Sequence, residues 1–159
     1  MSSEYVESII PVRYLQFKLG EENYAMELLK VKEVIPVPDT TPLPSSPPYY
    51  TGIMNLRGQI ISIIDLRKKL SIVSNAQNAE VAVIIVEIDG IGIGVMVDYI
   101  GKVLNLKNSD IAEVPEVSKQ INAKYIQGVY KDGDVLNIFL DIASILNINE
   151  IKNTQKKIA

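Results

Sequence analysis

The sequence predicts an all-β protein built as two related small barrels in tandem. Three observations lead to this prediction: strand patterns dominate the chain, two strong hairpin signals are centred on Asp89-Gly90 and Asp132-Gly133, and the order of elements repeats. Apolar residues make up 47% of the 159 residues, which is enough to form a core. A chain of this length forms one ordinary domain or two very small ones.

The first half of the chain alternates between strands and turns. Residues 14–19 alternate apolar and polar side chains, and Gly20 to Asn23 turn the chain. The apolar pattern of residues 24–35 begins with a period of two and then slips, which favours a bent or bulged strand. A helix over Met26 to Val34 is the alternative, because good helix formers lie there.

A proline-rich loop follows this strand. Residues 36–48 hold six of the eight prolines, whose missing N–H groups cannot join a sheet ladder. Residues 44–47 match PxxP, a pattern of SH3 ligands, but such proline density usually marks a stiff connection within the chain. We therefore expect an extended loop.

The stretch GIMNLRGQIISIIDLRKKL, residues 52–70, predicts a hairpin and a short helix. Two β-prone runs flank Arg57-Gly58, where Gly58 supplies the positive φ of a tight turn. Asp65 is the expected N-cap of the helix. Residues 74–80 form a polar joint to the second half.

The second half repeats these kinds of element. Two apolar strands flank Asp89-Gly90, and the glycines at 90, 92 and 94 fail as a phosphate loop because the chain continues as a strand. They indicate sharp curvature or close backbone contact. A strand with a break at Gly101, a loop through residues 114–116 and the hairpin at Asp132-Gly133 follow. Asp141 is the expected cap of a second short helix, and the tail from Asn149 is expected to fray.

The two halves can be aligned. The segment from Phe17 matches the segment from Val86 at an offset of 69 residues, and the hairpin and helix after Gly58 match those after Gly133 at an offset of about 75. Half a chain of roughly 70 residues without disulfides or metals has a marginal core, so each half is expected to need the other.

The composition excludes several classes of site. Cysteine and histidine are absent, so the chain has no disulfide framework, no thiolate nucleophile and no imidazole base or metal ligand. We find no GxSxG, no GxxxxGK[ST] and no EF-hand spacing. The net charge of −3 is too balanced for electrostatic binding to a polyphosphate or an anionic membrane. We expect no catalytic residues, no cofactor and no metal.

Two long segments, YLQFKLGEENYAMELLKVKEVI and TPLPSSPPYYTGIMNLRGQIISIIDLRKKL, closely resemble the CheW family, the coupling proteins of bacterial chemotaxis. The resemblance covers residues 14–146 as one CheW-like domain. It implies two five-stranded SH3- or OB-like barrels, approximately residues 14–75 and 80–146, with strands exchanged between them. Residues 1–13 and 149–159 are then frayed termini.

The resemblance implies a stand-alone adaptor that does no chemistry. Such a protein joins the cytoplasmic tips of methyl-accepting chemoreceptors to the regulatory domain of the histidine kinase CheA, and ring contacts between CheW copies are left open. It implies a cytoplasmic protein that is recruited to membrane receptor arrays without inserting into the membrane. The sequence agrees, because it lacks a signal-peptide layout and its apolar runs are far shorter than the ~20 residues of a membrane span.

Carried over by position, the resemblance assigns residues to three surfaces. The pair for receptor and kinase coupling is Glu33 and Arg57. The receptor groove is lined by Val31, Ile35, Ile100 and Val103. The loops for kinase or ring contacts carry Thr40, Thr41, Glu116 and Val117. Val31 and Val103 are taken as matched positions in the two halves. The alternatives are a solvated turn arginine for Arg57 and ordinary core packing for the valines.

Two other functions compete with this one. Small β-barrels bind single-stranded nucleic acids, and eight tyrosines can stack on bases, but the acidic balance and the lack of a basic stripe oppose that function. A carboxylate-based enzyme has Asp132 and Asp134 as candidates. Both flank a turn glycine, where exposed acids are ordinary, and no partner base is visible.

Overall fold

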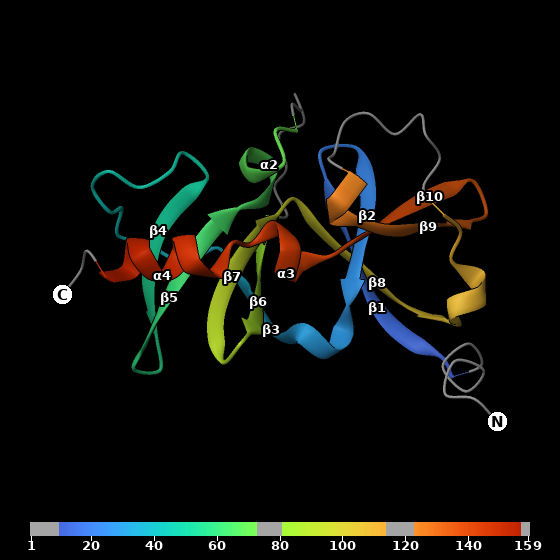
Figure 1. The fold of residues 1–159 in the computed structure, drawn as a ribbon, viewed down its shortest axis with the longest axis horizontal. Coiled ribbons are helices and arrows are strands. Elements are labelled where there is room, and N and C mark those ends of the chain that lie inside the picture. The colour runs from blue at the N-terminus through green and yellow to red at the C-terminus, as the bar shows by residue number, and fades with distance from the viewer. Residues whose placement is uncertain (1–9, 73–80, 114–122, 157–159) are drawn as a thin grey trace.

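Strands β1 to β10 make up most of the computed structural model, which describes residues 10–72, 81–113 and 123–156 (Figure 1). The strands of the first half are β1 Val12–Leu19, β2 Glu22–Glu27, β3 Val31–Pro36, β4 Tyr50–Leu56 and β5 Gln59–Asp65. Those of the second half are β6 Ala82–Ile88, β7 Ile91–Val97, β8 Tyr99–Leu106, β9 Ile126–Asp132 and β10 Val135–Leu140.

The helices are short. The α-helices are α2 Leu66–Lys69, α3 Ile142–Ile145 and α4 Ile148–Lys156, and the single 3-10 turns are η1 Leu28–Lys30, η2 Asn108–Asp110 and η3 Ala123–Tyr125. No helix in the described ranges is long and apolar enough to cross a membrane.

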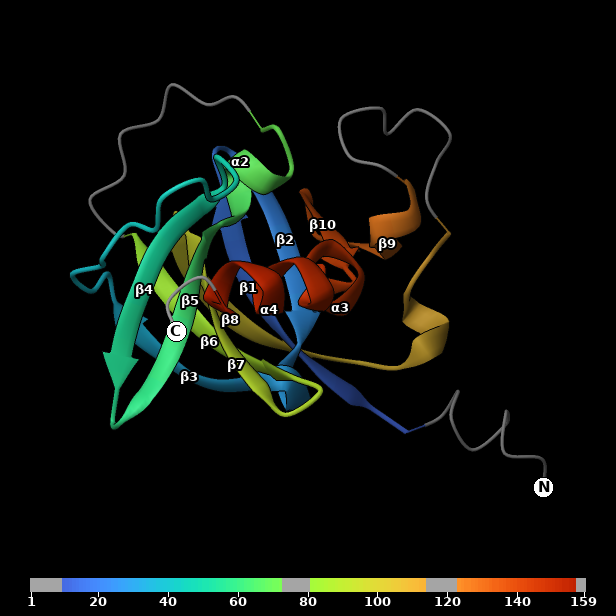
Figure 2. The ribbon, with the colours of Figure 1, turned by 60° about the vertical axis from the view of Figure 1, so that its left-hand side comes forward.

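The strands form two five-stranded sheets. Sheet A has the order β8-β1-β2-β10-β9, and sheet B has the order β3-β6-β7-β5-β4. Each sheet therefore combines strands from both halves of the chain, as Figure 2 shows. The predicted all-β fold of two five-stranded units is confirmed. The strand order in each sheet is linear, and within the described residues no ladder joins its two edge strands, so the units are barrel-like sheets without continuous closure.

The internal duplication is confirmed by topology and register. Replacing β1–β5 by β6–β10, and the reverse, converts the strand order of sheet A into that of sheet B. Ala25 lies beside Phe139 in sheet A, as Gly94 lies beside Ile63 in sheet B. The offset is 69 residues for the first three strands of each half and 76 for the last two. We call residues related in this way counterparts.

Turn and cap residues formed as predicted. Asp65 Oδ1 accepts from Lys68 N at 3.3 Å, and its counterpart Asp141 accepts from Ser144 N at 3.3 Å. Residues 24–35 belong to two strands in different sheets, separated by η1, so the single bent or bulged strand and the helix over Met26 to Val34 are both wrong. Pairing of both strands with neighbours in the sheets outweighs the local helix propensity.

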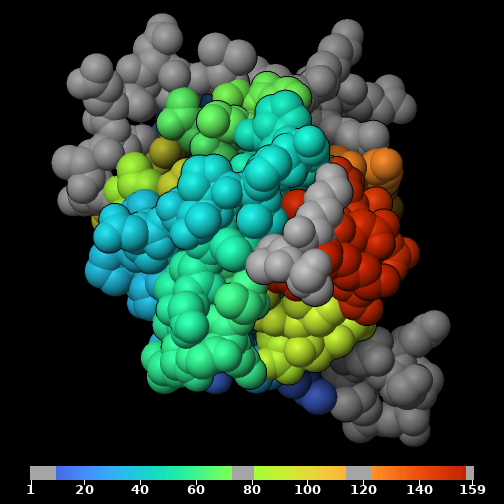
Figure 3. Space-filling model, turned by 90° about the vertical axis from the view of Figure 1, so that its left-hand side faces the viewer, coloured from blue at the N-terminus to red at the C-terminus, as the bar shows by residue number. Residues whose placement is uncertain are grey.

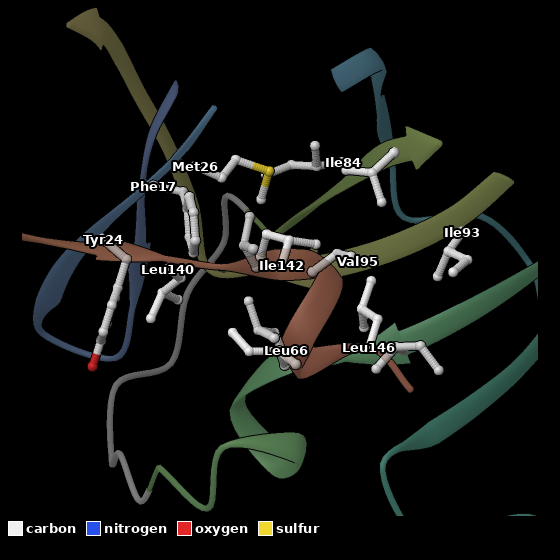
Figure 4. Packing of buried hydrophobic residues seen from close by; sticks show 14 of the residues in the cluster. Phe17, Tyr24, Met26, Leu66, Ile84, Ile93, Val95, Leu140, Ile142 and Leu146 are labelled. Carbon is white, nitrogen blue, oxygen red and sulfur yellow. The ribbon is translucent and has the colours of Figure 1, made fainter. Parts of the chain in front are cut away.

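Three hydrophobic clusters hold the fold together. Sheet A contains one around Tyr14 and Phe139, whose rings stack at 4.6 Å, and sheet B contains one around Ile61 and Ile85. The largest cluster, the shared core, joins both sheets to the helices, and Figure 4 labels Phe17, Tyr24, Met26, Leu66, Ile84, Ile93, Val95, Leu140, Ile142 and Leu146 in it. Burying each large apolar side chain contributes about 1.5–3 kcal/mol, so separating the halves would be costly.

The prediction of a frayed tail from Asn149 is wrong for residues 149–156. These residues belong to α4, whose Ile151 is buried in the shared core. Ile148 and Ile151 lie three residues apart, so both face the core from one side of a helix. At the other end of the chain, β1 already begins at Val12, and residues 1–9 and 157–159 lie outside the described ranges.

Candidate protein-docking surface

Arg57 occupies the tight turn between β4 and β5. Arg57 and Gly58 both have positive φ, +50° and +88°, as a type I′ turn requires. Asn55 Oδ1 accepts from Gly58 N at 2.9 Å and supports the turn from inside. The guanidinium Nη2 of Arg57 donates to Glu33 Oε1 on β3, so the two predicted coupling residues form an ion pair.

This ion pair joins the two edges of sheet B. β3 and β4 are the outer strands of that sheet. A backbone bridge between Thr41 and Ile53, with both N–O distances at 2.9 Å, separately ties the loop that follows β3 to β4. The ion pair thus links the two edges of sheet B where no ladder does. We call the Glu33–Arg57 pair the first clasp.

Sheet A has the same device with its charges reversed. Lys102 Nζ on β8 lies 2.6 Å from Asp132 Oδ2 at the β9–β10 hairpin, and Ala112 and Val129 form the second backbone bridge. The hydrogen bond and the negative charge of Asp132 raise the pKa of Lys102 above its ordinary value. Lys102 is the counterpart of Glu33, so the second clasp has its base on the strand and its acid in the hairpin.

The four predicted groove residues divide into three environments. Val31 and Ile100 are half-buried against the shared core, whereas Ile35 packs against the separate core of sheet B. Val103 is 48% exposed on the edge strand β8. The structure therefore brings Val31 and Ile100 into contact with the same cluster but leaves Ile35 and Val103 elsewhere.

The matching of Val31 with Val103 is wrong by three residues. Val31 pairs with Val86 as Ile100 pairs with Phe17, which makes Val31 and Ile100 counterparts. Val103 pairs with Leu15 as Val34 pairs with Ile84, so the counterpart of Val103 is Val34. Each of the two edge strands contains an adjacent Val and Lys and has a bulge in its ladder, and the ladder register agrees with the offset of 69 residues.

Thr40 and Thr41 lie where the proline-rich loop first meets β4. A Cβ on Gly52 would fall 2.7 Å from the carbonyl oxygen of Thr41 and 3.1 Å from the Cβ of Thr40, so the glycine permits this close approach. The other two predicted loop residues, Glu116 and Val117, lie outside the described residues.

The sequence matches the family model described as "CheW-like domain" over residues 13–150. This chain belongs to the CheW family. It is 33% identical over 140 residues to the chemotaxis protein CheW of Treponema pallidum, an alignment that covers 86% of this chain and 82% of that protein. It is 30% identical over 136 residues to the chemotaxis protein CheW of Bacillus subtilis, with coverage of 85% and 86%.

The fold is also similar to a solved CheW structure. The crystal structure of the scaffolding protein TtCheW from Thermoanaerobacter tengcongensis superposes with a TM-score of 0.79 at 31% identity. The match covers 89% of this chain and 91% of that one. The all-β fold read from the sequence is thus the fold of a CheW relative.

In this member of the CheW family, the two connections between the second and third strands of each half differ. Leu29 in η1 is 89% exposed, whereas its counterpart Asp98 is 4% exposed. Asp98 Oδ2 accepts from Gly20 N at 2.6 Å, and Asp98 Oδ1 pairs with Arg67 Nη1 at 3.1 Å. The sequence did not single out Leu29 or Asp98, although an aspartate that interrupts the apolar run VMVDYI was a usable signal for Asp98.

A hollow of about 290 Å³ lies beside the first clasp. Its floor includes Ile61 and Ile85. Its rim holds the first clasp and a further ion pair, distinct from both clasps, in which Lys32 Nζ lies 3.4 Å from Glu87 Oε2. Within the described residues, no group of three or more acidic side chains is placed to hold a metal ion. An apolar floor inside a charged rim suits contact with another protein surface.

Proposed function

We propose that this chain is a non-catalytic adaptor of bacterial chemotaxis. It couples the cytoplasmic tips of methyl-accepting chemoreceptors to the regulatory domain of the histidine kinase CheA. Membership of the CheW family over residues 13–150 is the observation that carries the proposal. The adaptor works in the cytoplasm and joins receptor arrays at the membrane through its partners.

Exposed apolar side chains on edge strands support a receptor-binding role. Val103 on β8 and its counterpart Val34 on β3 are 48% and 43% exposed, whereas five of the ten valines in the described strands are buried. Exposed valines supply apolar contact to the apolar face of a helix, which is the helix-in-groove mode of recognition. The groove is proposed to involve Val31, Ile35, Ile100 and Val103, with Val34 added by the structure.

The first clasp supports a role in coupling. Because Arg57 and Glu33 are exposed to solvent, their attraction contributes only about 0.2–1 kcal/mol to stability. Its larger effect is to fix the orientation of the β4–β5 hairpin relative to β3. We assign this pair to receptor and kinase coupling, and the loops that carry Thr40, Thr41, Glu116 and Val117 to kinase contacts or to contacts between copies.

Binding assays with two purified partners test the proposal. The kinase regulatory domain and a receptor-tip fragment are each titrated against the wild-type chain, Arg57→Ala and Val103→Lys. We expect Arg57→Ala to weaken coupling while the fold stays intact, and Val103→Lys to abolish receptor binding while the circular dichroism spectrum is retained.

Lys102→Ala is the matched control, because it removes the second clasp and leaves the first intact. Equal losses of thermal stability and binding in Arg57→Ala would make Arg57 a purely structural residue. Unchanged receptor binding by Val103→Lys would remove Val103 from the groove. Tight, salt-dependent binding of a labelled oligonucleotide by the wild-type chain would favour the nucleic-acid function instead.

A further inference from the structure

The C-terminal helix α4 makes the two halves of the molecule unequal. Tyr49 and Tyr125 are counterparts, since the carbonyl oxygen of each accepts from the N-cap aspartate of its half at 2.8 Å. Of the two, Tyr49 is the one that α4 reaches: its hydroxyl donates to the Glu150 carboxylate. The ammonium group of Lys69 lies over the Tyr49 ring, 4.2 Å from its centre, in a cation–π contact.

The helix is itself anchored on sheet B. Gln155 Nε2 donates to Ser62 Oγ at 2.6 Å, and Ser62 is also hydrogen-bonded to the hydroxyl of Tyr50 at 2.5 Å. Ile151 is buried in the shared core, and Asn147 Oδ1 accepts from Glu150 N at 3.2 Å at the start of the helix. Glu150 is thus presented to Tyr49 from a fixed backbone.

In the structure β3 ends at Pro36 and β4 begins at Tyr50, so the proline-rich loop predicted at residues 36–48 spans residues 37–49 and Tyr49 is its last residue. The loop is tied to β4 at its start by the Thr41–Ile53 bridge and at its end by the bond from Tyr50 N to Pro47 O, at 2.9 Å. Between these ties, Ser45 and Pro47 face α4 across a hollow of about 440 Å³. Figure 3 shows the loop and α4 on the same face of the molecule. Leu43 and Tyr49 also pack against the shared core that Ile151 of α4 enters, and the hydroxyl of Tyr49 adds a polar contact with the helix itself.

We propose that α4 braces the proline-rich loop, and that Glu150 and Tyr49 are positioning residues for kinase binding through Thr40 and Thr41. This inference rests on the proposed adaptor function. The brace limits the conformations that the loop samples before binding, so less ordering remains for the partner to impose. Binding of the receptor tip, assigned to Val103 and its neighbours, does not depend on the brace.

The test uses Tyr49→Phe in the full chain, because this change removes the hydroxyl and keeps the ring over Lys69. Its matched control is Tyr125→Phe, the same change at the counterpart position. Glu150→Gln is a second variant that approaches the contact from the helix and keeps an acceptor oxygen. Backbone amide hydrogen exchange at Thr41 and Tyr50 reports on the loop without any partner, and titrations with each partner fragment report on binding.

In Tyr49→Phe we expect faster exchange at these amides and roughly 3- to 10-fold weaker binding of the kinase domain, with receptor-tip binding unchanged. Glu150→Gln is expected to lie between this variant and the wild type, and Tyr125→Phe to match the wild type. Unchanged exchange in Tyr49→Phe overturns the brace, and so does an equal loss of binding to both partners. If the wild-type chain binds neither fragment, the adaptor function fails, whereas the exchange result still decides whether α4 holds the loop.

Discussion

Sheets A and B share one strand order and one register, yet their corresponding surfaces carry different chemistry. The first clasp has its acid on β3 and its base in the hairpin, and the second clasp has its base on β8 and its acid in the hairpin. Each sheet thus has one ion pair between an edge strand and the hairpin at its other edge, although Asp132 is the counterpart of Leu56 and not of Arg57. The two ion pairs therefore place charges of opposite sign on corresponding edge strands, at Glu33 and Lys102.

The links between the second and third strands differ in the same way. One exposes Leu29 to solvent, and the other buries Asp98 where the chain passes from sheet B to sheet A. A duplicated backbone plan can thus hold an exposed apolar residue at one position and a buried ion pair at its counterpart. Local side chains, rather than the strand plan, determine which link stabilises the fold and which is available for contact.

The largest expected effect comes from Asp98→Ala. This change removes a buried acceptor from Gly20 N and one partner of Arg67, and we expect a loss of about 3 kcal/mol in the free energy of unfolding. Urea denaturation measures it. Leu29→Ser at the counterpart position is the control and should change stability by less than about 0.5 kcal/mol. Similar values for the two variants would remove the proposed difference between the links.

High pH is expected to destabilise the protein, and Tyr24 of sheet A contributes to this; burial also raises the pKa of Tyr14 in sheet A and of Tyr49 and Tyr50 on the side of sheet B. Burial and the nearby charge of Glu22 raise the pKa of Tyr24 from 10.0 to about 12, whereas its counterpart in sheet B is Ile93. Because the folded-state pKa is the higher one, the stabilisation is complete below pH ~10 and is lost as the pH rises through 12. We expect a loss of about 2 kcal/mol by pH 12. Tyr24→Phe should reduce this pH dependence; a curve identical to that of the wild type would exclude Tyr24 as its source.

Exchanging a core residue between the sheets tests how closely their interiors correspond. Ala25 in sheet A has Gly94 as its counterpart, and a Cβ at Gly94 would lie 2.5 Å from Ile63 Cδ1 and 2.8 Å from Val83 Cγ1. We expect Gly94→Ala to destabilise the protein by about 1.5 kcal/mol through overpacking. Adding Ile63→Val should recover part of this loss in thermal unfolding. A Gly94→Ala variant as stable as the wild type would show that the core of sheet B adapts.

The smallest expected effect on stability comes from reversing the first clasp. Glu33→Lys alone should cost about 0.2–1 kcal/mol, and less at high ionic strength, because the pair is exposed. Glu33→Lys combined with Arg57→Asp gives sheet B the polarity of sheet A and should restore most of the stability. Kinase and receptor binding should remain impaired in the double variant. Recovery of binding together with stability would show that polarity carries no recognition.

Local sequence was sufficient to predict the hairpins, the two aspartate caps and the repeated order of elements. Asp89-Gly90 and Asp132-Gly133 indicate turns because the backbone conformation is set by two or three residues. Asp65 and Asp141 act on N–H groups three residues away. The exposed Val103 and the polar pair of Glu33 and Arg57 entered through the resemblance to the CheW family, and the structure added that Glu33 and Arg57 are in contact.

Two of the failed predictions have different causes. The matching of Val31 with Val103 disagreed with the 69-residue offset found in the sequence itself, which pairs Val31 with Ile100, and the ladders that β3 and β8 form with β6 and β1 confirm that offset. The tail from Asn149 is too short and too polar to form a stable helix alone. It becomes helical because Ile151 meets the shared core and Gln155 meets Ser62, 93 residues earlier.

The sequence by itself determined the all-β class, the positions of the turns and the duplication, because these features depend on patterns within a few residues and on their recurrence. Only the tertiary structure decided which strands were exchanged, which edges the two clasps join and that α4 contacts Tyr49 and Ser62 of the first half. Each of these depends on the free energy of contacts between segments far apart in the chain, and no local pattern contains that information.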